Sequence, residues 1–171
     1  MLMPGRRYRK DVRLGVIHCA ATPNGYNRYT IADIDEWHKA KNGWIRPRVG
    51  EPTEGSGPWR YCAYSYVIHT DGAKMPGRGL DEIPSATRGH NSHSVAICLI
   101  GTDAFTPAQW ASLSELCDQI DVKIGHRLQW VGHRDYSNKT CPGFDVGLWY
   151  DDQNRVPLER HVCKERLWTK K

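Results

Sequence analysis

Four short apolar runs, each about as long as one β-strand, alternate along the chain with segments of helical periodicity. The runs cover residues 12–18, 62–69, 94–100 and 127–132. Apolar runs of this length predict buried strands, and interleaved helices supply the cover that such strands need. The order therefore predicts an α/β fold with a central mixed β-sheet flanked by helices.

Two segments carry clear helix signals. Residues 30–41 begin with a capping pair, Thr30 and Asp33, and such pairs satisfy the free N–H groups of a first turn. Residues 106–124 begin with Thr-Pro and continue with one apolar stripe at helical spacing, which predicts an amphipathic helix. Weaker helices are expected near 144–150 and 157–168.

The remaining segments are predicted to be turns and loops. Asp71-Gly72 predicts a turn that leads from the second strand into a hairpin partner near 73–78. Residues 45–60 are rich in Pro, Gly and Arg and have no periodicity. Loops of this length in compact domains are often functional. Residues 79–93 are polar and are also expected to form a loop.

The 171-residue length suits one compact domain with its own core. Residues 1–13 hold five basic side chains against one acidic, and residues 155–171 hold six against two. We expect a flexible basic arm over 1–11 and a single domain over 12–171, with a basic helical tail from about 155. Basic ends suit an anionic partner such as a bacterial wall, an outer membrane or a nucleic acid, although solvated termini alone would explain them.

Neither a membrane span nor a disulfide framework is expected. No apolar run approaches the roughly 20 residues of a transmembrane helix. The first residues lack the apolar core of a signal peptide, so we expect synthesis in the cytoplasm. Disulfides are uncommon in proteins made by that route. Cys98 and Cys117 fall within apolar patterns and are interpreted as core residues.

His18 and His133 differ from the other histidines because each directly follows an apolar strand. A strand end is a rigid position from which to aim a ligand. Cys141 follows His133 by eight residues, and histidines with a thiolate suit zinc. This spacing is no general zinc pattern, so structural roles stay open. His38 lies among charges on the first predicted helix and is expected to face solvent.

Seven motifs lie in order over roughly residues 12–150. They are Ile17–Thr22 (IHCAAT), Ile34–Lys39 (IDEWHK), Tyr64–Ile68 (YSYVI) with Asp71-Gly72, Gly89–Asn91 (GHN), Ser94–Gly101 (SVAICLIG), Phe105–Gln109 (FTPAQ), and Gly132–Asp135 (GHRD) continuing to Lys139–Gly143 (KTCPG). Together they resemble the type 2 N-acetylmuramoyl-L-alanine amidases. The resemblance is closest to the small zinc amidase lysozymes of T-odd coliphages, which are relatives of the peptidoglycan recognition proteins.

The resemblance implies a mixed sheet with helices on both sides and one zinc ion per chain at the floor of a surface groove. By position, His18, His133 and Cys141 would hold the zinc. Tyr64 matches the family's catalytic tyrosine, and Lys139 matches the lysine two residues before the cysteine. The implied reaction is hydrolysis of the amide bond between N-acetylmuramic acid and L-alanine in bacterial peptidoglycan.

The pattern leaves two points open at the catalytic positions. Tyr64 alternates with Tyr66 on a predicted strand, so the two side chains should point to opposite faces and either could be functional. Tyr64 and Lys139 both suit the role of proton donor to the reaction intermediate, and the sequence does not choose between them.

The substrate-binding positions depart from the family pattern. The family often has His-Ala shortly before Gly-x-Asn, where this chain has Ala86-Thr87. Either a substrate-positioning histidine is missing here, or His90 or His93 replaces it; His90 and Asn91 are the residues predicted to bind substrate. Thr140 would add a hydroxyl near the metal.

The resemblance favours a phage endolysin, a monomer made in the host cytoplasm that reaches the cell wall once the membrane is permeabilised. The alternative is a non-catalytic peptidoglycan-binding or regulatory protein of the same fold. Binding relatives typically lack the cysteine ligand, whereas Cys141 is present. A host recycling amidase is a further hypothesis, which the cysteine also disfavours because those enzymes place Asp there.

Overall fold

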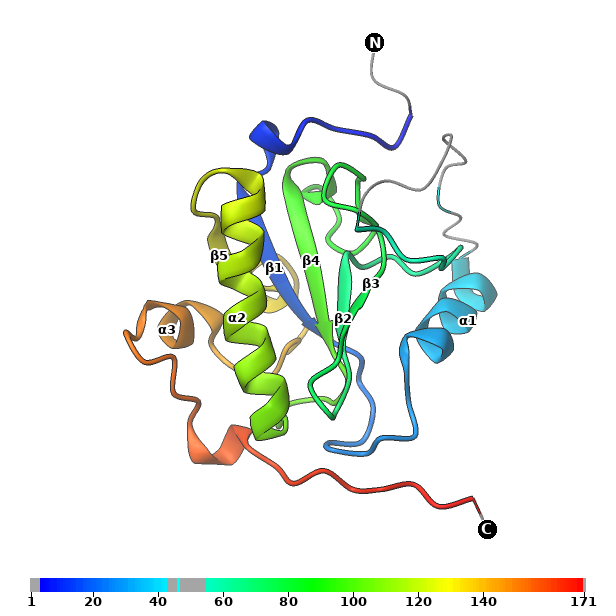
Figure 1. The fold of residues 1–171 in the computed structure, drawn as a ribbon, viewed down its shortest axis with the longest axis vertical. Coiled ribbons are helices and arrows are strands. Elements are labelled where there is room, and N and C mark those ends of the chain that lie inside the picture. Colours follow the sequence, from blue (N-terminus) through cyan, green and yellow to red (C-terminus); the bar gives the residue numbers. More distant parts are fainter. Residues whose placement is uncertain (1–3, 43–45, 47–54, 171) are drawn as a thin grey trace.

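The computed structural model describes residues 4–42, 46 and 55–170. Its strands are β1 (Leu14–Cys19), β2 (Tyr66–Ile68), β3 (Lys74–Pro76), β4 (Ser94–Leu99) and β5 (Gln129–Gly132). They form one sheet in the order β3-β2-β4-β1-β5 (Figure 1). All neighbouring pairs are parallel except β2 and β3, which form the predicted antiparallel hairpin. The predicted α/β fold with a mixed sheet is confirmed.

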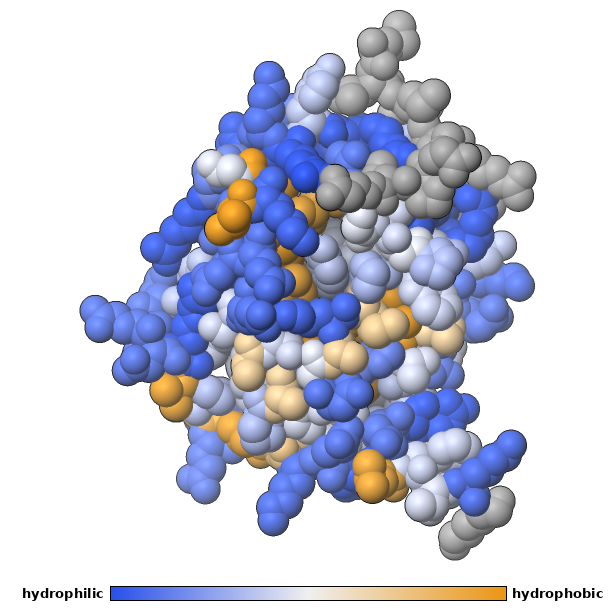
Figure 2. Space-filling model, viewed as in Figure 1, coloured by the Kyte–Doolittle hydropathy of each residue, from blue (hydrophilic) through white to orange (hydrophobic). Residues whose placement is uncertain are grey.

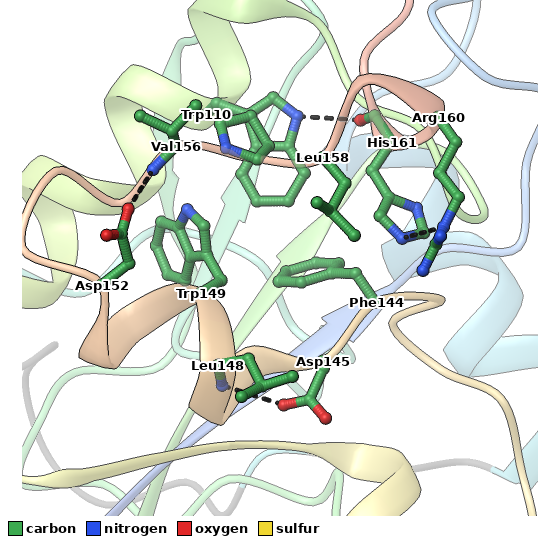
Figure 3. Close-up of a pocket in the computed structure, with 11 residues that line it drawn as sticks. Trp110, Phe144, Asp145, Leu148, Trp149, Asp152, Val156, Leu158, Arg160 and His161 are labelled. Atoms are coloured by element: carbon green, nitrogen blue, oxygen red, sulfur yellow. Dashed lines mark hydrogen bonds between the residues drawn. The ribbon is translucent and has the colours of Figure 1, made fainter.

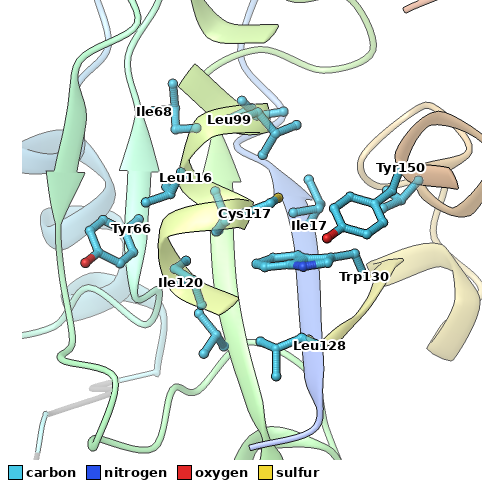
Figure 4. Close-up of a cluster of buried hydrophobic side chains, with 14 of the residues drawn as sticks. Ile17, Tyr66, Ile68, Leu99, Leu116, Cys117, Ile120, Leu128, Trp130 and Tyr150 are labelled. Atoms are coloured by element: carbon cyan, nitrogen blue, oxygen red, sulfur yellow. The ribbon is translucent and has the colours of Figure 1, made fainter. Parts of the chain in front are cut away.

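Helices cover both faces of this sheet. α2 (Pro107–Ile124) lies across one face, where its apolar stripe packs against strand side chains that include Ile17 and Leu99 (Figure 4). On the opposite face, Ile31 and Ile34 of α1 (Ile31–Asn42) share a core cluster with Cys98. α3 (Val146–Asp151) contacts β5. The sheet is therefore buried on both sides, as its continuous apolar runs predict.

The start of α2 is fixed by the predicted cap. The Thr106 hydroxyl accepts the N–H of Gln109 at 3.1 Å, and the Gln109 side-chain oxygen accepts the N–H of Thr106 at 3.0 Å. The Gln109 amide also donates to the carbonyls of Ile68 and Ile100, at 3.3 and 2.8 Å. One buried side chain thus caps the helix and ties it to the carboxyl ends of two strands.

The strand predicted over 62–69 is shorter than expected, because only the residues of β2 pair in the sheet. Asp35 on α1 accepts the N–H groups of residues 61–62, both at 2.7 Å. Nδ1 of His38 accepts the N–H of Ala63 at 3.0 Å. Donors engaged by helix side chains cannot join a strand ladder. The prediction that His38 faces solvent is therefore wrong.

The helix predicted over 157–168, and with it the helical tail, is also wrong. Only one turn, η4 (Glu159–His161), is helical, and no other helix or strand occurs between residues 157 and 168. Two isolated parallel bridges join the tail to neighbouring loops, Val162 with Phe105 and Arg166 with Tyr26. Backbone groups of the tail are thus satisfied by partners distant in sequence rather than by a helix of its own.

The flexible arm predicted over 1–11 is wrong for the described residues 4–11. Arg7 is only 5% exposed, and Arg6 lies 3.8 Å from carboxylate oxygens of both Asp81 and Glu82. This segment is packed onto the rest of the molecule. The loop predicted over 45–60 lies largely outside the described residues.

The surface in Figure 2 is mainly hydrophilic, with hydrophobic residues scattered over it. Val122, Leu148 and Leu167 are the most exposed of the large hydrophobic residues that the structure describes. In the part of the chain that the structure describes, no helix combines the length and the apolar content needed to cross a membrane. Cys98 and Cys117 are fully buried, as predicted.

Candidate metal centre

Three potential metal ligands meet at the carboxyl edge of the sheet. His18 lies near the end of β1, and His133 begins the turn η3 (His133–Tyr136) directly after β5. β1 and β5 are parallel neighbours, with Ile17 opposite Gly132, so the two histidines emerge side by side with ring centroids 4.6 Å apart. Ligand atoms of His18, His133 and Cys141 all lie within 4.8 Å of one another.

The loop after β5 brings Cys141 back to the histidines. The carbonyl of Cys141 accepts the N–H of Arg134 at 2.7 Å, and its sulfur accepts the N–H of Cys19 at 3.2 Å. Gly132 permits this return, because a Cβ there would lie 2.9 Å from Cδ of Pro142. The thiol is thereby held against the end of β1.

Both histidines favour the neutral form that binds metals. Burial, the His133 ring and Lys139 all lower the pKa of His18, and burial and Lys139 lower the pKa of His133. A neutral imidazole offers a lone pair to a cation without first losing a proton. The environment of both rings is therefore suited to metal binding at neutral pH.

Cys141 and Cys19 are neighbouring thiols whose ionisation is linked. A hydrogen bond between them lowers the pKa of Cys19 to about 7 and raises the pKa of Cys141. Only one thiol of such a pair ionises readily. A cation held by the two histidines would favour the thiolate on Cys141, because a metal deprotonates the thiol that binds it.

The three donors fit a zinc ion. Zinc–nitrogen and zinc–sulfur bonds are about 2.0–2.3 Å long, so ligand atoms less than about 5 Å apart can reach one ion with small movements. Two imidazoles and one thiolate are borderline and soft donors, a set that favours zinc over magnesium or calcium. Within the described residues no fourth His, Cys, Asp or Glu joins the group. Three protein ligands are typical of catalytic zinc sites.

Tyr64 faces this site, and Tyr66 faces the other way. The ring of Tyr64 lies 5.2 Å from the ring of His18 and 5.4 Å from that of His38, whereas Tyr66 belongs to the core cluster under α2. Burial raises the pKa of Tyr64 well above its usual value of 10. Its phenol therefore keeps its proton at neutral pH. Of the alternating pair, Tyr64 is therefore the tyrosine that lies beside the candidate ligands.

Lys139 and Thr140 lie in the loop after β5, and both are exposed to solvent. The positive charge of Lys139 lowers the pKa of both histidines, which places it within electrostatic range of the ligands. The Thr140 carbonyl accepts the N–H of Gly143 at 2.7 Å. The assignment of Lys139 to catalysis and Thr140 to substrate binding remains a prediction.

His90 and Asn91 have different surroundings. The His90 ring packs on Tyr136, with centroids 4.0 Å apart, and Nδ1 lies 3.4 Å from Nε2 of His93. His90 is partly exposed, which is compatible with substrate binding but does not test it. Its role in substrate binding stays a prediction. The side-chain oxygen of Asn91 accepts the N–H groups of Ala86 and Thr87 at 2.9 and 2.8 Å. That oxygen is engaged in shaping its own loop.

Sequence reasoning missed two residues at the site. The Thr87 hydroxyl lies 3.3 Å from Nε2 of His18, at the position where the chain departs from the family's His-Ala pattern. Cys98 pairs with His18 in the register of β1 and β4. The departure at Thr87 was a usable signal, whereas nothing in the apolar pattern distinguished Cys98 from a core residue.

A separate cavity of about 300 Å³ lies between α2, α3 and the segment before η4 (Figure 3). Its walls are mainly apolar and include Trp110, Phe144 and Trp149. None of the three candidate ligands lines it. The cavity is therefore distinct from the candidate metal centre.

Comparison with known proteins connects this site to a family. A family model described as N-acetylmuramoyl-L-alanine amidase matches residues 8–144. The endolysin of Klebsiella phage KP32 is 32% identical over 156 residues, covering 86% of this chain and 91% of that protein. The endolysin of Escherichia phage T7 is 31% identical over 153 residues, covering 84% and 89%. Bumblebee PGRP-SA shares the fold, with a TM-score of 0.65 and 22% identity over 86% and 85% of the two chains.

Proposed function

Because the chain belongs to the N-acetylmuramoyl-L-alanine amidase family, we propose that it hydrolyses the amide bond between N-acetylmuramic acid and L-alanine in bacterial peptidoglycan. It would act as a phage-type endolysin with one zinc ion per chain. One observation supports this most: His18, His133 and Cys141 converge within 4.8 Å, and the protonated phenol of Tyr64 lies beside them.

The ligand set would hold the zinc ion in a form suited to hydrolysis. Zinc bound by three protein ligands supplies Lewis acidity and makes water a nucleophile near neutral pH. His18 and His133 would bind as neutral imidazoles, and Cys141 as a thiolate stabilised by the N–H of Cys19. A peptide N–H aimed at the sulfur favours the charged form of that ligand.

Tyr64 and Lys139 would act on the reacting amide. Hydrolysis forms a C–O bond and breaks the C–N bond, so negative charge develops on the carbonyl oxygen and the leaving nitrogen of L-alanine needs a proton. Lys139 would stabilise the oxyanion with its positive charge. Tyr64 keeps its proton, so it would donate a hydrogen bond to the oxyanion or a proton to the nitrogen. His90 and Thr140 would contact the substrate around them.

The setting proposed for this activity is the bacterial cell wall. The chain would be made in the host cytoplasm and act as a monomer on peptidoglycan after the membrane is permeabilised. The basic C-terminal segment would assist at an anionic wall or outer-membrane surface. Arg6 and Arg7 make internal contacts, so the N-terminal segment would contribute less to that attraction.

The alternative is a protein that binds peptidoglycan without cutting it. A binding module needs neither an open metal site nor a protonated group beside it. Cys141 completes the ligand set, and Tyr64 faces it. These two features favour the hydrolase.

Removal of zinc tests the proposal. Purified protein is added to chloroform-permeabilised Gram-negative cells, and the loss of turbidity is followed for untreated, chelator-treated and zinc-restored samples. We expect the chelator to abolish lysis and zinc to restore it, whereas magnesium, which prefers oxygen ligands, does not. A folded, zinc-loaded protein that causes no lysis would count against the endolysin and favour the binding module.

A further inference from the structure

Arg7 holds the loop between β3 and β4 from inside the protein. Its Nε donates to the carbonyl of Leu80 at 3.1 Å, and Nη1 donates to the carbonyls of Asn91, at 3.0 Å, and Ser94. Burial lowers the pKa of Arg7 to about 10, so the guanidinium stays charged at neutral pH. One rigid, forked guanidinium thus binds carbonyls from both ends of the loop, an arrangement that a lysine could not reproduce.

Asn91 connects the anchor at Arg7 to the middle of the loop. Its backbone carbonyl is held by Arg7, and its side-chain oxygen accepts the N–H groups of Ala86 and Thr87 at 2.9 and 2.8 Å. Short side chains that accept nearby N–H groups fix the course of a turn. The position of Thr87 therefore depends on a residue whose own backbone is anchored by Arg7.

Thr87 in turn contacts a metal ligand. Its hydroxyl lies 3.3 Å from Nε2 of His18, and both side chains are 1% exposed. A histidine that binds a metal through one nitrogen usually gives the other to a hydrogen-bond partner, which sets its tautomer and orientation. Cys141 sulfur accepts the N–H of Cys19 and so lies at the backbone end of His18, the end that carries Nδ1.

We propose that Arg7, Asn91 and Thr87 form a positioning relay that engages Nε2 of His18 and presents Nδ1 to the metal. The proposal rests on the metal site described above. It gives the N-terminal segment a role in the site, although none of its residues needs to touch the substrate. In this account Thr87 orients the imidazole and Arg7 acts through the loop.

Thr87→Val tests the last step of the relay. The substitution keeps the shape of the side chain and removes the hydroxyl, and Thr87→Ser is the matched control that retains it. Zinc affinity is measured by competition with a chromogenic chelator. We expect Thr87→Val to bind zinc about 10-fold more weakly, the lower end of what an outer partner contributes, and Thr87→Ser to bind close to wild type.

The tautomer of His18 provides a readout that loss of stability would not change. Long-range ¹H–¹⁵N NMR of the zinc-loaded wild type should show the proton of His18 on Nε2. A proton on Nδ1 would overturn the relay, and so would wild-type zinc affinity in Thr87→Val. A wild-type protein that binds no zinc would instead overturn the metal site itself.

Arg7→Lys tests whether the anchor acts through Thr87. The substitution retains the charge but loses the fork, and unfolding of the metal-free variant in urea reports whether it is folded. We expect weaker zinc binding by the folded variant, and no further loss when Arg7→Lys and Thr87→Val are combined, because both changes release the same ring. Losses that simply add in the double variant would show that Arg7 acts elsewhere.

Discussion

Replacing Cys141 with serine is expected to lower both zinc affinity and lytic rate by more than about 100-fold, the upper limit for loss of an outer-sphere partner. A hydroxyl ionises far less readily than a thiol, and zinc binds the ionised form. The variant should fold, because the Cys141 side chain is only partly buried and the carbonyl that anchors the loop to Arg134 is unchanged.

Cys163→Ser is the matched control for this change. Cys163 is a partly buried free cysteine whose thiol donates to the carbonyl of Ala104 at 3.5 Å, and it does not belong to the ligand group. Zinc content is measured by elemental analysis after dialysis, and lysis by turbidity. If Cys141→Ser keeps the zinc content and lytic activity of the wild type, Cys141 does not bind the metal.

Replacing Tyr64 with phenylalanine is expected to lower kcat by about 100-fold, within the range for loss of a general acid or an oxyanion donor. Only the hydroxyl is removed, so ring packing against His18 and His38 should persist. Zinc affinity should stay near that of the wild type, because the phenol is not part of the ligand set. The loss should therefore appear in turnover and not in metal content.

Tyr66→Phe is the control, since this side chain lies two residues away and packs in the core under α2. Turnover is followed with permeabilised cells at several cell densities, so that changes in kcat and in KM can be separated. Equal activities for Tyr64→Phe and Tyr66→Phe would exclude a catalytic role for the Tyr64 hydroxyl. Lys139 would then be the remaining candidate for the essential proton donor.

The sequence predicts best those features whose causes are local. The cap at Thr106, the stripe that follows it and the turn at Asp71-Gly72 each depend on neighbouring residues, and each appears where the pattern places it. The strand runs are also recognisable, because a sheet covered on both faces needs continuous apolar segments.

Features that depend on distant partners could not be predicted. Arg7 resembles any basic residue near a terminus, yet its acceptors at Leu80, Asn91 and Ser94 lie 73 to 87 positions away. The tail after η4 likewise takes its conformation from Phe105. The sequence shows the helical propensity of the tail but not its distant backbone partners. In the fold, pairing with these partners outweighs that propensity.

The candidate site likewise contains some residues that the sequence predicts and others that only the fold reveals. His18 and His133 could be found because each stands at the end of an apolar run, and parallel pairing of β1 with β5 places both at one edge. The family resemblance added Cys141 and Tyr64. Thr87 and Cys98 approach the site only through the folded loop and the sheet register. The departure from the family pattern marks the position of Thr87 but does not predict its contact with His18.

The identity of the bond that is cut tests the central claim most directly. Purified peptidoglycan is digested with the zinc-loaded protein, and the released fragments are examined by mass spectrometry and by labelling of new amino and reducing ends. The proposed amidase predicts glycan strands without stem peptides and peptides with free L-alanine amino termini. New reducing sugar ends, or new amino termini within the stem or cross-link, would contradict it and assign the chain to another class of wall hydrolase.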